Sequence, residues 1–218
     1  MRMSRRMGLL GGRGVPTLAE LFSNMTYVTG AYRDASSMST FRLTISNIPD
    51  SSSPYYVIFC GGPIGFEFFR VNNGTKIQLC RAGNSTCSVS SSYITSPSVY
   101  AGFIAIVRFP AYTSEVVDQV LGAVNISIKA SVNNQSTSPV NWSSPAPIAD
   151  ALYFAGFVSN STIYFSISLG SSILSAIFAR PGSIMYLYYM TMYGNMYTLS
   201  VTGQTYAMVR CGGIYELT

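Results

Sequence analysis

The sequence predicts an all-β fold, an antiparallel β-sandwich of the jelly-roll-like kind with an extended N-terminal arm and one or two short helices. Three observations predict it. Apolar residues alternate with polar ones at a period of two, turn residues interrupt these segments at sandwich spacing, and only two segments have helical character. The chain has 218 residues, which suits one sandwich core better than two. We expect an arm with a short helix over residues 1–38 and a single β-sandwich domain over residues 39–218.

Two short helices are expected, one before the β region and one inside it. Residues 16–22 begin with a proline and place Leu18, Leu21 and Phe22 on one side. Residues 113–120 begin with Thr-Ser, and either hydroxyl is suited to cap one or two helical turns between strands.

Strands are expected over the rest of the chain. Alternation is clearest at residues 161–169, where Ile163, Phe165 and Ile167 share one face. The Asn73-Gly74 pair between apolar segments predicts a tight hairpin, and the polar segment 132–147 predicts a long surface loop. Further alternating strands are expected at 41–45, 77–79, 124–129 and 197–201, and strands buried on both faces at 55–60, 99–109, 151–158, 172–179 and 184–190.

The composition argues against an enzyme. Charged residues make up only 10% of the chain, histidine is absent, and the acids number eight. Most acid/base and metal chemistry therefore lacks its usual groups, and we expect no catalytic residue, metal or cofactor. The close acid pair Glu115 and Asp118 is interpreted as solvated charge on a helical turn. A polar but weakly charged surface repels copies of itself little, which favours assembly.

The positive charge belongs to the arm. Four of the thirteen basic residues, Arg2, Arg5, Arg6 and Arg13, fall in the first thirteen positions, which leaves 9 basic residues against 8 acidic ones in the rest. The simplest interpretation is a solvated, disordered terminus. A more specific interpretation is weak contact with nucleic acid phosphates at the inner surface of a shell. A twin-arginine signal is disfavoured because glycines interrupt its apolar part. The apolar segment 172–190 is interrupted by Arg-Pro-Gly, so no transmembrane segment is expected.

The four cysteines are Cys60, Cys80, Cys87 and Cys211. We expect disulfides, with Cys80–Cys87 closing a compact loop and Cys60–Cys211 joining two Cys-Gly-Gly segments; four buried free thiols are the alternative. Seven of the eleven asparagines lie in Asn-X-Ser/Thr sequons, which predicts N-glycosylation. Clustering of Asn, Ser and Thr in loops is the alternative explanation. The sequon asparagines are Asn24, Asn73, Asn84, Asn125, Asn134, Asn141 and Asn160.

Tyrosine is abundant, with sixteen tyrosines and twelve phenylalanines against two lysines. A dense group near the C-terminus is interpreted as an interface stripe or, equally, as a half-buried sheet face. It comprises Tyr186, Tyr188, Tyr189, Tyr193 and Tyr197.

An acid-poor, Ser/Thr/Tyr-rich and sequon-dense β chain with Cys-Gly-Gly strand ends resembles the structural surface proteins of icosahedral viruses of hot-spring crenarchaea, the capsid, penton and turret jelly rolls. The resemblance implies a virion protein that self-assembles as a homo-oligomer and with other structural subunits. An arginine arm at the inner surface favours this interpretation.

Two alternatives stay open. The first is a subunit of an extracellular, cell-surface archaeal filament that polymerises by donor-strand complementation, with residues 27–32 as the donor strand. The second is a carbohydrate-binding module with a row of exposed tyrosines.

Overall fold

The computed structural model describes residues 14–133, 140–144, 152–159, 163–168, 173–179, 185–192, 197–203 and 209–218, and describes side chains over 14–131 and 212–218. It confirms the predicted all-β fold class with antiparallel sheets. The described residues form antiparallel strands with two α-helices and two 3-10 turns. The helices are α1 (Leu18–Ser23) and α2 (Ser114–Gly122), and the 3-10 turns are η1 (Ile45–Asn47) and η2 (Gly62–Ile64).

The first eight strands precede α2. They are β1 (Thr26–Ser39), β2 (Arg42–Thr44), β3 (Tyr55–Cys60), β4 (Gly65–Asn72), β5 (Thr75–Gly83), β6 (Ser88–Val89), β7 (Tyr93–Thr95) and β8 (Val99–Arg108). The other eight follow α2. They are β9 (Ile126–Asn133), β10 (Val140–Ser144), β11 (Leu152–Ser159), β12 (Ile163–Ser168), β13 (Ile173–Ala179), β14 (Met185–Met192), β15 (Tyr197–Gly203) and β16 (Val209–Leu217).

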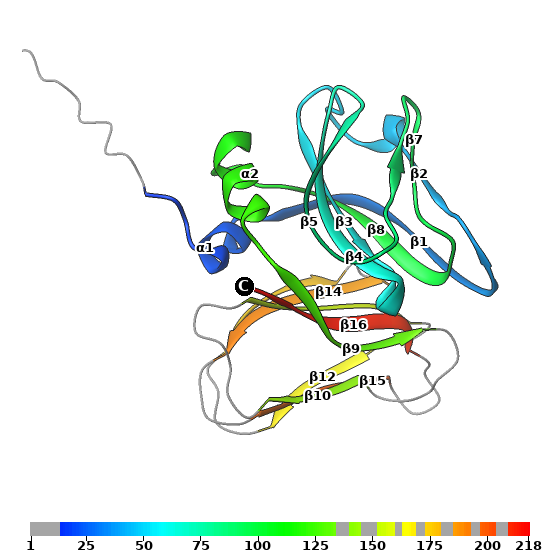
Figure 1. Ribbon diagram of the computed structural model, residues 1–218, viewed down its shortest axis with the longest axis vertical. Helices are drawn as coiled ribbons and strands as arrows, with labels where there is room; N and C mark the ends of the chain where they lie inside the picture. Colours follow the sequence, from blue (N-terminus) through cyan, green and yellow to red (C-terminus); the bar gives the residue numbers. More distant parts are fainter. Residues whose placement is uncertain are drawn as a thin grey trace, which may run out of the picture.

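These strands form four sheets in two groups. Strands β1–β8 make sheet A, in the order β1-β8-β3-β4-β5, and sheet B, in the order β2-β7-β6. Strands β9–β16 make sheet C, in the order β13-β14-β11-β16-β9, and sheet D, in the order β10-β15-β12. Sheet C lies between sheet A and sheet D (Figure 1). The single sandwich expected over residues 39–218 is therefore divided into two pairs of sheets.

Both groups share a nested pairing order. In the first group β1 pairs with β8 and β2 with β7, and in the second β9 pairs with β16, β10 with β15 and β11 with β14. Each group thus pairs its first strand with its last and its second with its second-last. This is the order that results when one long hairpin is rolled up into two facing sheets.

Sheet A is covered on both faces, which explains its apolar strands. One core packs Tyr56, Phe68 and Phe103 against both helices and against Tyr215 and Leu217 of β16. The other core lies between sheets A and B. All six residues of β3 are buried, as expected from the continuous apolar run at residues 55–60.

Local sequence accounts for both helices. Thr17 caps α1, and the carboxylate of Glu20 accepts a hydrogen bond from the Thr17 backbone N–H at 2.8 Å, which completes a capping box. The Thr113 hydroxyl accepts from the Val116 N–H and caps α2. Both helices begin one or two residues after the predicted first residue, because the proline and the capping residues lie outside the helical hydrogen bonds.

The predicted hairpin is confirmed. Asn73 and Gly74 connect β4 to β5 with φ of +48° and +74°, so both turn residues lie in the left-handed region. This is the two-residue turn whose twist matches that of paired strands.

The segment after α1 differs from the sequence prediction. Residues 26–38, which we assigned to the arm, form most of β1 at the edge of sheet A. An edge strand is half exposed, so β1 carries Thr, Ser, Arg33 and Asp34 and lacks a clean alternation. Only residues 1–13 of the arm lie outside the described residues.

Candidate functional site

The arm residues predicted to contact nucleic acid, Arg2, Arg5, Arg6 and Arg13, lie outside the described residues. The described chain begins at Gly14, directly before α1. The described chain thus starts at the end of the fold where α1 and α2 lie (Figure 1).

The disulfide prediction for Cys80 and Cys87 is wrong. Cys80 and Cys87 are both buried and both free. Cys80 belongs to the core beneath the helices, whereas Cys87 belongs to the core between sheets A and B, so sheet A separates the two sulfur atoms. The side chain of Cys211 lies outside the described ones, so the pairing of Cys60 with Cys211 stays a prediction.

The repeated Cys-Gly-Gly segments meet at a buried tyrosine. Tyr215 of β16 is fully buried, and its hydroxyl donates to the Gly62 carbonyl oxygen at 3.1 Å. The Cys60 sulfur lies 3.3 Å from the same hydroxyl, within hydrogen-bonding distance of it. The ring stacks on Phe66 with centroids 4.3 Å apart. A Cβ at Gly213 would come within 2.6 Å of this ring, so the second segment needs its glycine there.

Burial governs the thiols of this region. It raises the pKa of Cys60 to about 11, against a smaller lowering by the hydrogen bond to Tyr215. It also raises the pKa of Cys80 to about 12. Both groups therefore stay protonated, and neither has the thiolate character that a nucleophile requires.

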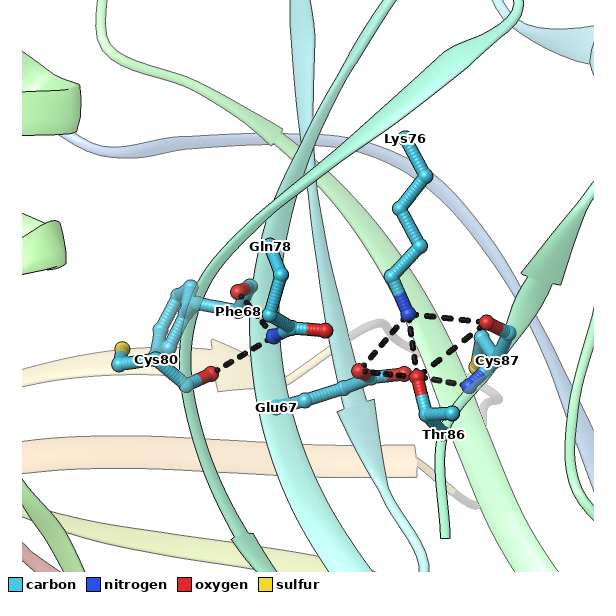
Figure 2. Close-up of polar contacts among 7 residues, drawn as sticks. All are labelled: Glu67, Phe68, Lys76, Gln78, Cys80, Thr86 and Cys87. Atoms are coloured by element: carbon cyan, nitrogen blue, oxygen red, sulfur yellow. Dashed lines mark hydrogen bonds and ion pairs between the residues drawn. The ribbon is translucent and has the colours of Figure 1, made fainter.

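A buried ion-pair network lies on the other face of sheet A (Figure 2). The Glu67 carboxylate is fully buried, and one oxygen accepts from Lys76 Nζ at 3.0 Å and from the Thr86 hydroxyl at 2.9 Å. Its other oxygen accepts from the Cys87 N–H at 2.6 Å, and Lys76 also donates to the Cys87 carbonyl oxygen at 2.8 Å. Both carboxylate oxygens are thus occupied by the protein, which suits a brace between β4, β5 and the 84–88 segment and not a catalytic base.

Sequence reasoning missed this network. Glu67 lies between phenylalanines in β4, and an acid inside a continuous apolar strand was the available indication of a buried, paired carboxylate. Its partners come from β5 and from the loop after it, which a one-dimensional pattern does not bring together. Burial raises the pKa of the Cys87 thiol, and the negative charge of Glu67 raises it further.

A second ion pair fastens α2 to sheet A. The Arg70 guanidinium contacts both oxygens of Asp118, with Nη2 2.8 Å from Oδ2 and Nε 3.0 Å from Oδ1. The Tyr56 hydroxyl donates to Asp118 at 3.3 Å, and burial raises the pKa of Tyr56. Asp118 is therefore a paired residue, while Glu115 is exposed, so the predicted solvated pair holds for Glu115 alone.

A hollow beside this pair has a cavity volume of about 230 Å³. Two of its polar side chains are already engaged: Arg108 donates to the carbonyl oxygens of Pro49 and Asp50, and Tyr56 to Asp118. The hollow therefore offers a ligand mainly apolar walls. Its lining is Pro54, Tyr56, Arg108, Phe109, Pro110, Tyr112 and Ser114.

The sequons occupy different environments. Asn73 and Asn84 are exposed, at the β4–β5 turn and in the loop after β5. Asn24 is half-buried, and its amide donates to the Glu20 carbonyl oxygen at 2.9 Å, so a glycan there would cost a helix-end contact. Asn125 is exposed and pairs through its backbone with Thr218. Asn141 lies in β10 without a described side chain, and Asn134 and Asn160 lie outside the described residues.

The tyrosine stripe is distributed over two sheets. Tyr186, Tyr188 and Tyr189 belong to β14 of sheet C, and Tyr197 belongs to β15 of sheet D. Their side chains, and Tyr193 altogether, lie outside the described part. The proposed donor segment, residues 27–32, lies in β1 and pairs with β8 of the same chain.

The described residues lack two kinds of feature. They contain no cluster of three or more His, Cys, Asp or Glu side chains arranged to hold a metal. Among the helices described, none has the length and apolar character needed to cross a membrane.

The chain was compared with known proteins at three levels. No family model, curated protein or solved structure matches it.

Proposed function

We propose that this chain is a structural virion protein, a capsid, penton or turret subunit, that self-assembles through its β-sandwich surfaces and an arginine-rich arm. The observation that carries the proposal is the nested pairing order of both strand groups. In the second group it follows three of the four pairs of a rolled eight-stranded hairpin, the arrangement of a jelly roll.

The charge distribution supports an assembly role over catalysis. Glu67, Asp118 and Glu216 are each paired with a basic side chain inside the fold. The body as a whole is also nearly neutral, with 9 basic and 8 acidic residues outside the first thirteen positions. A body of this kind approaches copies of itself without strong repulsion, while the arm supplies the charge for a partner.

The partner proposed for the arm is nucleic acid, held weakly. Four arginines that neutralise four phosphates predict a salt dependence with a log–log slope of about −3.6, or a loss of about a hundredfold in affinity between 50 and 200 mM salt. Contact of this strength positions a genome without reading its sequence.

Electron microscopy of the purified full-length protein, with and without nucleic acid, tests the proposal. We expect closed shells or rings of five-fold or six-fold symmetry. Deletion of residues 2–14 is expected to leave the far-UV circular dichroism unchanged while impairing assembly. A matched variant with all four arm arginines changed to lysine keeps the charge and is expected to assemble.

Other outcomes would contradict the proposal in distinguishable ways. Uniform filaments with an ordered strand passing between subunits would establish donor-strand polymerisation. A monodisperse protein that binds glycans and never assembles would establish the carbohydrate-binding alternative. Assembly unaltered by the deletion would reject the role of the arm.

A further inference from the structure

An apolar groove lies between the start of α1 and the end of α2. It has a cavity volume of about 330 Å³. Val15 lines the groove and is 58% exposed. Among the described large apolar side chains, it has the highest exposed fraction. The lining residues are Val15, Pro16, Leu18, Gln119, Val120, Ala123, Val124 and Thr218.

The groove lies where the arm joins the fold. Gly14 is the first described residue, and Val15, on the groove wall, follows it. Leu9 and Leu10 precede the groove in the sequence and are separated from Val15 only by Gly11, Gly12, Arg13 and Gly14.

The linker permits the chain to turn back. Five residues from Leu10 to Val15 span at most about 17 Å when extended. Glycine takes up left-handed as well as right-handed backbone conformations, so three glycines among four linker residues allow a reversal at low steric cost.

We propose that this groove holds Leu9 and Leu10 of the same chain and thereby anchors the arm. The short tether decides in favour of the same chain over a second copy, because it gives these leucines an effective concentration of the order of millimolar at the groove. The anchor leaves Arg2, Arg5 and Arg6 beyond it, projecting from the end of the molecule that carries α1 and α2. The anchoring does not depend on the virion role; only the use of the projecting arginines does.

A pair of engineered cysteines tests the anchor in the full chain. Leu9→Cys is combined with Gln119→Cys, since Gln119 lines the groove and is exposed. The matched control combines Leu9→Cys with Ser91→Cys, an exposed residue in the β6–β7 turn, across sheet A from the helices. Cys211→Ser is present in both.

Under mild oxidation we expect an intramolecular disulfide at Leu9→Cys/Gln119→Cys, identified by peptide mass spectrometry, that forms at least about tenfold faster than in the control. An intermolecular disulfide dimer would overturn the proposal in favour of an arm from a second copy. Equal rates in test and control would overturn it outright. Neither result requires assembly, so the proposed function is tested separately.

A proteolysis experiment gives a second readout without oxidation. In the otherwise unchanged chain, the double substitution Leu9→Asp/Leu10→Asp is expected to speed tryptic cleavage after Arg13 about tenfold, because the linker opens. The control Met3→Asp/Ser4→Asp adds the same charge outside the anchor and is expected to leave that rate unchanged. Equal cleavage rates in the two variants would contradict the anchor.

Discussion

At the scale of single residues, Tyr215 joins the two strand groups. It comes from β16 of sheet C, yet its hydroxyl is bound to Gly62 and near Cys60, and its ring stacks on Phe66 of sheet A. A buried tyrosine of this kind buries the apolar area of its ring, and the hydrogen bond of its hydroxyl fixes the orientation of the side chain. The junction between sheets A and C is thus fixed by one side chain as well as by general packing.

The thiols give the first residue-scale prediction. We expect Cys80 and Cys87 to resist alkylation in the native protein at pH 8, because burial raises the pKa of both thiols and keeps them protonated, and to react in denaturant without prior reduction. Peptide mass spectrometry after alkylation measures this. Cysteines that react in denaturant only after a reductant is added would restore the disulfide prediction.

The buried thiols also set an alkaline limit. Since the folded-state pKa values of Cys60 and Cys80 are raised from 9.0 to about 11 and about 12, the folded state holds these protons more tightly than the unfolded state does. Their contribution to the free energy of unfolding is fully present below pH 9 and is lost as the pH rises through 11.

The sequence indicated which residues matter at the junction between sheets A and C, but not which residues they contact. The Cys-Gly-Gly repeat marks a real junction, where Gly213 makes room for the Tyr215 ring. An even count of cysteines is consistent with many pairings and with none. Only the placement of Cys80 and Cys87 on opposite faces of sheet A decides between them.

At the scale of elements, the β4–β5 hairpin depends on its turn. Gly74 has φ of +74°, and no atom would contact a Cβ built on it. A methyl group added there would therefore change the stability of the fold only through backbone strain, without a packing contribution.

A matched pair of alanine substitutions uses this separation. Gly74→Ala is expected to lower the free energy of unfolding by about 1 to 2 kcal/mol, the cost of a left-handed residue with a Cβ. Gly122→Ala, at the end of α2, also meets open space, and its φ lies outside the left-handed region. It is expected to be neutral or stabilising by about 0.5 to 1 kcal/mol. Chemical denaturation measures both, and equal effects would contradict the turn assignment.

Strands were predictable where burial is uniform. The runs at residues 55–60 and 99–109 became β3 and β8, both at the centre of sheet A, because an apolar run buried on both faces needs no alternation. β1 was not predictable as a strand, since an edge position tolerates polar residues and register shifts such as the one between Asp34 and Ser39. The nested order of pairing likewise depends on contacts distant in sequence.

At the scale of the whole molecule, the two strand groups share one core. The cluster beneath α1 and α2 includes side chains of β3, β4 and β8 together with Tyr215 and Leu217 of β16 and the partly buried Ile126 and Ile128 of β9. Sheet C therefore completes the burial of sheet A. Separating the groups would expose apolar surface on both sides of the junction, which couples their stabilities.

This coupling predicts that the chain unfolds as one unit. The only tryptophan, Trp142, lies in β10 of the second group, so its fluorescence follows that group, while far-UV circular dichroism follows all strands. We expect the two denaturation curves to coincide.

Tyr215→Phe is expected to lower the free energy of unfolding by about 1 to 3 kcal/mol, because the Gly62 carbonyl loses its buried donor. Both curves are expected to shift together to lower denaturant concentration. Tyr32→Phe, at a half-exposed position, is the control and is expected to shift neither. If the fluorescence transition moves alone, the two groups are independent domains and the shared core does not couple them.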